Sequence, residues 1–231
     1  MNNPLAPMNS PVPLEKMTYE AIKEAILTFA LKPGQPLVEN DLASQLNISK
    51  TPVRDALLRL EKEGLVEKIP YKGAFVTEVN QRTMHEIFEI RAVLEGMGVR
   101  LAIPNITPDD LKKLHQILDR HALAVKNGRI DEASDLNRKF HELIVERSSN
   151  LWLKQILSNL EDHLRRYRLL SNYQAGRLDK SIQEHERILK AIENGDGFEA
   201  EAGMKDHLIS VVNDLSTEDF DTLVSQITHK N

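Results

Sequence analysis

The second part of the chain, from Thr83 to the last residue, carries apolar side chains at spacings of three and four and shows no alternating pattern. Spacing of this kind gathers apolar side chains on one face of a helix, whereas a half-buried strand needs alternation. Helices whose apolar faces can be buried only against one another form a bundle. The expected helices cover 83–102, 108–127, 131–148, 150–172, 178–195, 197–214 and 217–229. The sequence therefore predicts an all-helical antiparallel bundle of six to seven helices.

Residues 14–78 show a different pattern, in which helical segments are followed by short alternating ones. A first helix is expected to end near Pro33 and Gly34, because both residues break helices. Two more helices are expected over 39–46 and 50–64, and the segments LVEKI and AFVTEV, separated by PYKG, then predict a hairpin. We expect residues 14–78 to form a separate small domain, preceded by a flexible tail over 1–13. A linker over 79–82 would join this domain to the bundle, over 83–231.

Composition excludes several classes of protein. The 231 residues include no cysteine, which excludes disulfides, a thiol nucleophile and metal sites built on sulfur. The first residues lack a basic segment followed by an apolar run, and no stretch approaches the roughly 18 apolar residues that a membrane helix needs. We therefore expect a cytoplasmic protein without a membrane partner. With 30 basic and 35 acidic residues the net charge is −5, so binding to nucleic acid requires a local basic surface.

The segment QLNISKTPVRDALLRLEKEGLV has the layout of a helix-turn-helix: a short helix, a tight turn and a longer helix. The longer helix would present small, polar and cationic side chains at its N-terminal end, where free backbone N–H groups favour phosphate oxygens. Arg54 could donate two hydrogen bonds to a guanine edge. The following hairpin turn would add Lys68 and Lys72 beside the duplex. The alternative is an ordinary solvated surface, since residues 1–80 hold 9 basic and 10 acidic side chains.

Residues 31–79 resemble the winged helix-turn-helix domain of GntR-family transcription regulators. The similarity lies in the PG turn, the LA..L helix, the stretch S.TPVR.AL..L...GL and the G.FV strand. Many relatives carry an arginine at the position of Asn40, at the start of the preceding helix. The contact of that arginine with phosphate or base is not carried over to this chain. The resemblance implies that the start of the recognition helix and the tip of the wing contact operator DNA, which here are Ser49, Lys50, Thr51, Arg54, Lys72 and Gly73.

Three histidines and an asparagine form a second group of candidate site residues. Asn137 and His141 are four residues apart, so they share one face of a helix. His185 and His207 each lie in the apolar stripe of another helix, which should face the core. One such histidine is usually a core residue, but three of them with an amide oxygen favour a metal site. Imidazole and amide oxygen suit zinc, nickel, manganese or iron.

Residues 83 to about 214 are similar to the FCD ligand-binding domain of the FadR branch of the GntR family. The similarity lies in EIRAVLEGMGVRLA, NRKFHELIVERSSN, EHERILKAIENGD and AEAGMKDHL. Many such domains bind a divalent metal through an Asp-x-x-x-His pair and two later histidines, which implies Asn137, His141, His185 and His207 as ligands here. Asn137 replaces the usual aspartate and removes one negative charge. We expect weaker metal binding, or a more positive site that binds an anion more tightly.

Arg91 is expected to point into the bundle, because Ile87 and Leu94 lie one turn away on either side. A buried arginine needs a partner. One interpretation is a structural ion pair with Glu95, four residues later. The other is a fork that binds the carboxylate of an effector.

Together these features predict a ligand-responsive transcription regulator that is not an enzyme. We expect a homodimeric repressor on a palindromic operator, with a divalent metal, zinc first, and a small carboxylate effector such as an organic or sugar acid. One alternative is a metal-dependent hydrolase that uses the three histidines, although Glu142, Glu184 and Glu186 are expected to point away from the ligands and leave no general base. The other alternative is a DNA-binding protein with a purely structural metal site.

Overall fold

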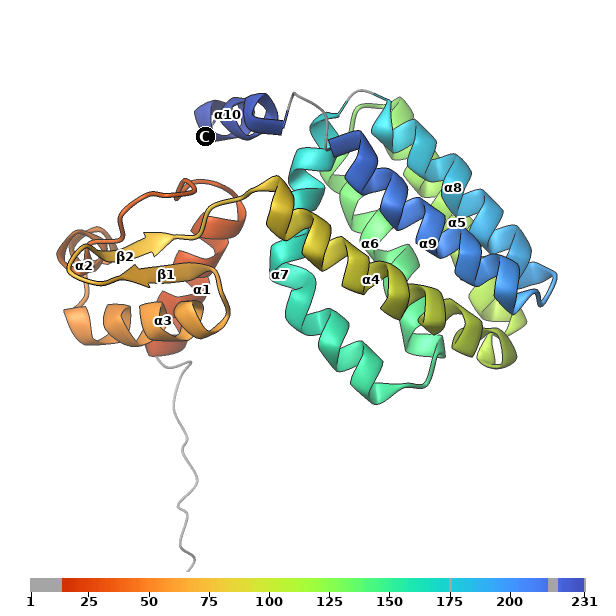
Figure 1. Cartoon of the computed structure of the whole chain (residues 1–231), viewed down its shortest axis with the longest axis horizontal. Coiled ribbons are helices and arrows are strands. Elements are labelled where there is room, and N and C mark those ends of the chain that lie inside the picture. The colour runs from red at the N-terminus through yellow and green to blue at the C-terminus, as the bar shows by residue number, and fades with distance from the viewer. Residues whose placement is uncertain (1–13, 175, 216–219, 231) are drawn as a thin grey trace, which may run out of the picture. The chain divides into compact units, whose positions relative to one another are not determined.

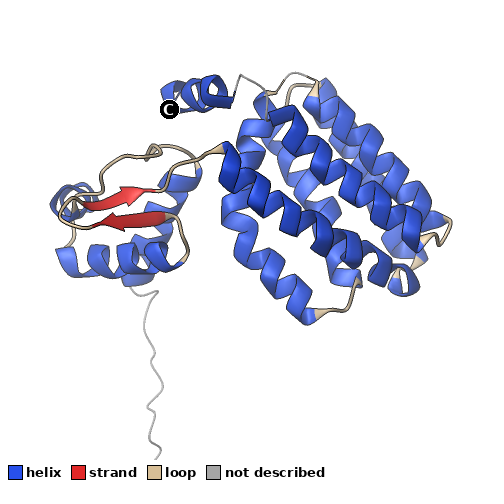
Figure 2. Ribbon diagram, viewed as in Figure 1, coloured by secondary structure: helices blue, strands red, loops and turns tan. Residues whose placement is uncertain are grey.

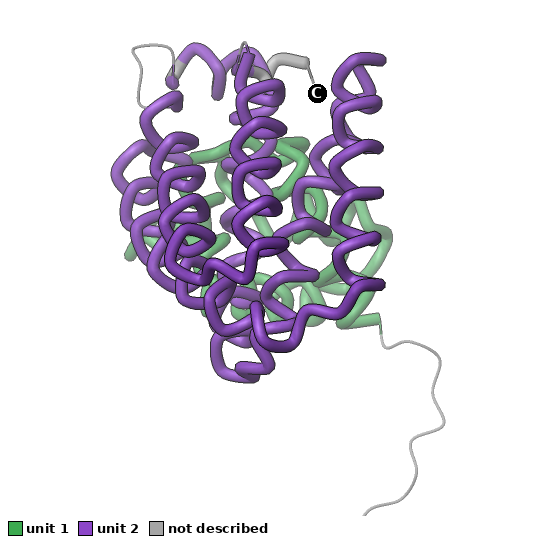
Figure 3. The backbone as a smooth tube through the Cα atoms, turned by 90° about the vertical axis from the view of Figure 1, so that its right-hand side faces the viewer, with its two compact units in different colours: residues 1–78, 231 green, residues 79–230 purple. Residues whose placement is uncertain are grey.

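The computed structural model describes residues 14–174, 176–215 and 220–230, so the tail predicted over 1–13 lies outside the described residues. The chain divides between Glu78 and Val79 into two compact units, drawn in different colours in Figure 3. Helix α4 (Gln81–Ala102) begins inside the segment predicted as a linker, because the Asn80 side chain accepts a hydrogen bond from the Thr83 N–H and caps the helix. The predicted fold class, mainly helical with a winged helix-turn-helix followed by a helical bundle, is confirmed.

The first unit contains three helices and a hairpin, in the predicted order (Figure 2). Strands β1 and β2 are antiparallel, with Val66 opposite Val76 and Ile69 opposite Gly73. The turn between α2 and α3 is tight because Asn47 adopts a left-handed conformation that ends α2. The elements are α1 (Leu14–Leu27), α2 (Glu39–Leu46), α3 (Lys50–Lys62), β1 (Val66–Ile69) and β2 (Gly73–Val76).

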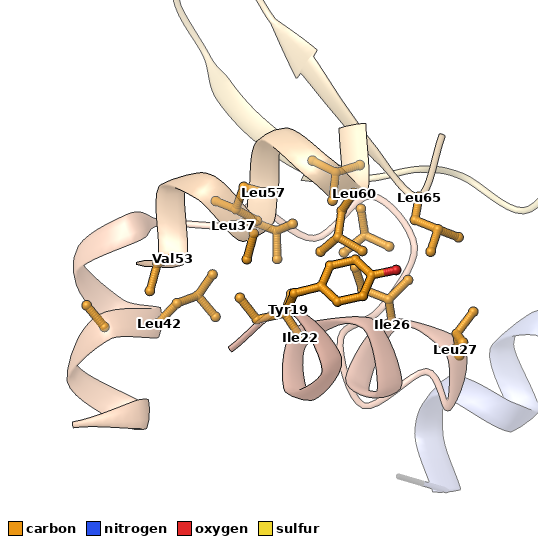
Figure 4. Close-up of a cluster of buried hydrophobic side chains, with 14 residues drawn as sticks. Tyr19, Ile22, Ile26, Leu27, Leu37, Leu42, Val53, Leu57, Leu60 and Leu65 are labelled. Carbon is orange, nitrogen blue, oxygen red and sulfur yellow. The ribbon is translucent and has the colours of Figure 1, made fainter. Parts of the chain in front are cut away.

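One continuous apolar core holds this unit together (Figure 4). Ile22 and Ile26 from α1 face Val53 and Leu60 from α3, and all four side chains are buried. Full burial of a side chain of this size contributes roughly 1.5–3 kcal/mol relative to leaving it in water. The core lies on one face of α3, so the opposite face and the first turn of α3 remain exposed for a partner.

The predicted end of the first helix was wrong. Helix α1 ends at Leu27, because Phe29 adopts a left-handed conformation and the Leu31 N–H bonds back to the Ala25 carbonyl at 2.9 Å. This closing bond belongs to a C-terminal cap that sequence periodicity does not reveal. Gly34 instead serves the following turn, where a Cβ atom would lie 2.4 Å from the Glu78 carboxylate.

The second unit is a helical bundle in which α4 packs along α9, α5 packs against α6 and α8, and α8 packs against α9 (Figure 1). Its described helices begin and end within a few residues of the predicted ranges, except that residues 217–219 of the last one lie outside the described residues. No helix in the described part of the chain combines the length and the apolar character needed to cross a membrane. Beside α4, the elements are the short 3-10 helix η1 (Ile103–Asn105), α5 (Pro108–Lys126), α6 (Ile130–Arg147), α7 (Leu151–Tyr173), α8 (Arg177–Glu193), α9 (Gly197–Leu215) and α10 (Phe220–Lys230).

Candidate metal centre and DNA-binding surface

Three buried histidines from three different helices converge inside the second unit. The Nε2 atom of His185, on α8, lies 3.2 Å from Nε2 of His141, on α6, and 3.3 Å from Nε2 of His207, on α9. Nitrogen ligands about 2.0–2.1 Å from a tetrahedral ion are themselves about 3.3 Å apart. The observed separations therefore fit three ligands of one metal ion, and the structure brings together the three histidines that the sequence predicted.

Two carboxylates orient the outer histidines of this group. Nδ1 of His141 is hydrogen-bonded to Glu95, and Nδ1 of His207 lies 2.7 Å from Oε2 of Glu184. An Nδ1–H that donates to a carboxylate leaves the Nε2 lone pair free for a metal. The expectation that Glu184 points away from the ligands was wrong, because α9 packs beside α8 and places His207 on the side to which Glu184 projects.

Each of these carboxylates is held by a buried arginine. Arg91 pairs with Glu95, as one of the two interpretations of Arg91 predicted, and it faces inward as its position on the helix predicted. Arg177 pairs with Glu184 and also bonds Asp214 at 2.8 Å. Burial by itself would raise the pKa of Glu184, but hydrogen bonds from His207 and Arg177 outweigh it and lower the pKa to about 2. The carboxylates that orient the histidines are therefore ionised.

Burial also sets the protonation of the histidines. It is the largest cause that lowers the pKa of His207 to about 4 and the pKa of His185 well below the ordinary value, and the neighbouring histidines lower both further. Burial likewise lowers the pKa of His141 against the opposing effect of Glu95. At neutral pH the rings are neutral, which is the form that binds a metal.

Asn137 lies one turn before His141 on α6. Its Oδ1 atom is buried and has no hydrogen-bond partner among the described residues. A buried acceptor without a partner costs about 1–3 kcal/mol. A cation bound by this oxygen and the three histidines would satisfy it, so the residues present fit a metal ion with nitrogen and oxygen ligands.

His121 belongs to the same region and was not singled out from the sequence. It lies on α5, is 0% exposed, and its ring centre is 6.1 Å from that of His185. Neither of its ring nitrogens has a hydrogen-bond partner among the described residues, and burial, with a smaller effect from His141, lowers its pKa to about 4. The signal in the sequence was its position in the apolar stripe of Leu114 and Leu118, at the same phase of the helix.

A cavity of about 320 Å³ opens beside the metal centre, between α4, α6 and α7. Arg91, Glu95 and His141 all line it, so the arginine predicted to bind an effector and one predicted metal ligand face the same space. Apolar side chains and further ion pairs also line the cavity. A small molecule held here would lie between the buried arginine and the histidine.

The candidate DNA-binding residues lie on the exposed side of the first unit. Ser49 precedes α3 as its N-cap residue, and Lys50 and Thr51 form its first turn with exposed side chains. The side chain of Arg54, one turn further, is 61% exposed. Arg54 lines a groove of about 540 Å³, and residues of the hairpin, Lys72 and Gly73 among them, line the same groove. The structure thus places Arg54 and the tip of the wing along one groove, with the start of α3 beside Arg54.

Two features of this surface were not foreseen. Arg54 is already bound by an acid of its own chain, since its Nη2 lies 2.8 Å from Oε2 of Glu39 and its Nε is close to both Glu39 oxygens. The hydrogen bond from Arg54 is the main reason why the pKa of Glu39 is lowered. Tyr71, at the wing tip, is fully exposed and has a φ of +65°, which bulky residues rarely adopt.

Each of the two units matches a known protein family. Residues 14–76 match the model of "Bacterial regulatory proteins, gntR family", and residues 86–210 match that of the FCD domain. The uncharacterized HTH-type transcriptional regulator YdhC of Bacillus subtilis is 32% identical over 186 residues, which cover 80% of this chain and 83% of YdhC. The structure of Escherichia coli McbR/YncC is 30% identical, has a TM-score of 0.66, and the match covers 94% of this chain and 99% of that one.

A winged helix-turn-helix joined to an FCD domain defines a DNA-binding transcription regulator. The chain belongs to the GntR family of bacterial regulatory proteins, as the resemblance in its sequence predicted. It is therefore a regulator of transcription and not an enzyme, because the family and the matching relatives are transcription regulators, which gives the hydrolase alternative no support. Another relative, the HTH-type transcriptional repressor RspR of Escherichia coli, is 25% identical over 201 residues, which cover 87% of this chain and 88% of RspR.

Proposed function

We propose that the protein is a cytoplasmic, ligand-responsive repressor that binds operator DNA as a homodimer and holds a divalent metal and a small carboxylate effector in its FCD domain. The observation that carries this proposal is the convergence of three histidine Nε2 atoms beside a cavity lined by a buried arginine. A metal and a guanidinium that face one small cavity form a receptor for an anion.

The DNA-binding part rests on the exposed start of α3 and on the wing. Ser49, Lys50 and Thr51 offer hydroxyl and ammonium groups beside free backbone N–H groups, which suits phosphate contacts. Arg54 can read a guanine after it releases Glu39. Lys72 and Gly73 bring the wing to the backbone of the duplex. Two copies related by a two-fold axis would read two half-sites of a palindrome.

The metal part rests on His141, His185 and His207 as nitrogen ligands and on Asn137 as an oxygen ligand. Zinc is the first expectation for such a set, and nickel, manganese and iron are the alternatives. When bound, the ion would supply a positive centre that attracts an anion. Glu95 and Glu184 keep two of the rings in the binding tautomer.

The effector part rests on Arg91. Its guanidinium faces the cavity and is shared with Glu95, so a carboxylate of the effector would compete with Glu95 for the same donor. Glu95 also holds His141, so this exchange changes contacts on α4 and α6 together. Operator affinity falls only if the effector binds one arrangement of the protein better than the other. Repression is proposed because RspR, a relative over most of the chain, is named a repressor.

The test uses the full chain with zinc, and a duplex obtained by selection from random DNA. The bound metal is counted by elemental analysis, and operator binding is measured by fluorescence anisotropy with and without a panel of carboxylic acids. We expect about one metal per chain, a palindromic selected sequence, and a weaker operator complex with at least one acid. If chelation melts the bundle while no acid alters DNA affinity, the metal site is purely structural and the effector role is rejected.

A further inference from the structure

The cavity beside the metal centre changes character with depth. At its inner end lie Arg91, Glu95 and His141, all nine-tenths or more buried. The charges of Arg91 and Glu95 balance one another, so an ion bound by the histidines would make this end net positive. The inner end therefore suits one anionic group and has no unpaired acid that would hold an ammonium.

One part of the cavity wall is apolar. Leu157 and Leu164 project from the same face of α7, about two turns apart, and Val145 projects from α6. Leu157 is 9% exposed and Leu164 is 3% exposed, while Val145 is half-buried. Hydroxyl groups placed against this wall would lose their hydrogen bonds to water without replacement, which is unfavourable.

The outer part of the cavity is charged but already balanced. Arg138 pairs with Glu142 and Lys154 pairs with Glu146, and all four side chains are a third or more exposed. Arg168, further in, pairs with Glu161. Every cation that lines the cavity thus has an acid partner within the described residues. A second carboxylate on the ligand would find no unpaired cation among these residues, with the Ser158 hydroxyl as the neutral donor, and would meet the acids of these pairs.

We propose that the effector is a monocarboxylic acid with a compact apolar body, of the aromatic or branched short-chain class, rather than a sugar acid or a dicarboxylic acid. This inference rests on the proposed function and narrows it, because the sequence indicated only a small carboxylate, with organic and sugar acids as examples. The carboxylate occupies the inner end beside Arg91, and the apolar body lies against Leu157, Leu164 and Val145. A volume of about 320 Å³ is at the small end of ligand sites, which suits a compact ligand.

The experiment compares four probes on the zinc-loaded full chain by isothermal titration and thermal shift. The probes are phenylacetate, 3-methylbutanoate, gluconate and succinate. We expect phenylacetate or 3-methylbutanoate to bind at least about tenfold more tightly than gluconate and succinate, and to raise the melting temperature.

Two variants test the apolar wall. Val145→Thr keeps the shape of the side chain and adds a hydroxyl, so it should weaken phenylacetate binding about threefold to tenfold while the metal content stays unchanged. Leu157→Asn should have a larger effect in the same direction. The matched control is Ile156→Asn, a change of the same kind at the adjacent, more exposed position of α7 that does not line the cavity, and it should leave phenylacetate binding unaltered.

The outcomes separate this inference from the function on which it rests. If gluconate or succinate binds as tightly as the apolar acids, the inference that the effector is an apolar monocarboxylic acid is overturned. The proposed function, a regulator that responds to an acid, then still stands. If Val145→Thr and Leu157→Asn alter binding no more than Ile156→Asn does, the acid does not lie against this wall, and the inference is also overturned. If no probe and no other acid of the wider panel binds or changes operator affinity, the effector role itself fails.

Discussion

The two candidate sites of this molecule are built in opposite ways. The three histidines of the candidate metal centre are buried, and two of them are oriented by carboxylates that are in turn held by buried arginines. The residues of the candidate DNA-binding surface are exposed, and Arg54, which we propose reads a base, is bound by an acid that DNA would have to displace. A small ion needs ligands fixed within a fraction of an ångström, whereas a long polyanion is met by side chains that adjust. The difference predicts that substitutions at the metal centre act through geometry, and those at the DNA surface through single contacts.

The largest effect is expected from removing two ligands at once. His185→Ala combined with His207→Ala should abolish stoichiometric metal binding, because too few ligands would remain to hold the ion. Elemental analysis of the purified protein measures this directly. His115→Ala, an exposed histidine of α5, is the control and should leave the metal content intact. Unchanged stoichiometry in the double variant would mean that the histidines are core residues only.

The next effect concerns the DNA surface. Arg54→Ala should weaken binding to the selected operator by about 1–3 kcal/mol and relax the preference at one base pair, because a bidentate base contact is lost. Lys62→Ala, which removes the same charge near the other end of α3, serves as the comparison. Equal affinity and equal selectivity of Arg54→Ala and wild type would remove Arg54 from base readout.

A third prediction tests whether orientation matters as much as ligation. Glu184→Gln keeps the size of the side chain but weakens the hydrogen bond to His207, so metal affinity should fall about 10–100-fold. Competition with a chelating dye gives the affinity. Glu186→Gln, which is exposed on the same helix, should leave the affinity as it is. A loss of the same size in both variants would point to net charge rather than orientation.

A substitution of Asn137 is expected to raise metal affinity rather than lower it. Asn137→Asp adds a negative charge to a buried oxygen that has no hydrogen-bond partner among the described residues, so metal binding should tighten about tenfold if this oxygen is a ligand. The same dye competition measures it. An affinity equal to that of the wild type would exclude residue 137 from the ligand set.

The smallest effect is expected from His121, measured on the metal-free protein. The pKa of His121 is lowered from 6.5 to about 4, so between these values the unfolded chain binds a proton that the folded chain does not. Folding stability is therefore lost as the pH falls below about 6.5. His121→Leu should reduce this loss by about 1 kcal/mol at pH 5.5 relative to pH 8, as measured by urea unfolding. A loss of the same size in His121→Leu and wild type would contradict the assignment.

Much of the fold could be predicted from the sequence, because helical periodicity and helix-breaking residues act locally. The inward direction of Arg91 and of the three histidines followed from the same periodicity. The end of α1 could not be predicted, since it depends on the left-handed conformation of Phe29. Periodicity places a residue on a face of its own helix but gives no information about the neighbouring helix.

The same limit explains what was missed at the two sites. Glu184 contacts His207 because α9 lies beside α8, and Glu39 contacts Arg54 because α2 and α3 pack together. His121 joins the group only when α5 packs against α8. Each of these contacts joins residues 15 or more positions apart, so no local pattern in the sequence could show it.

The pair formed by Glu39 and Arg54 has a consequence for how the protein searches DNA. Detaching the arginine from its own acid has the same cost at every position along a duplex, and among the base edges guanine is the one that accepts two hydrogen bonds from an arginine. Because this cost is the same for every sequence, an internal competitor of this kind lowers the affinity for all of them and leaves the ratio between the right site and the wrong ones unchanged. A neutral residue at position 39 would therefore be expected to yield a regulator that binds all DNA more tightly and selects among sequences equally well.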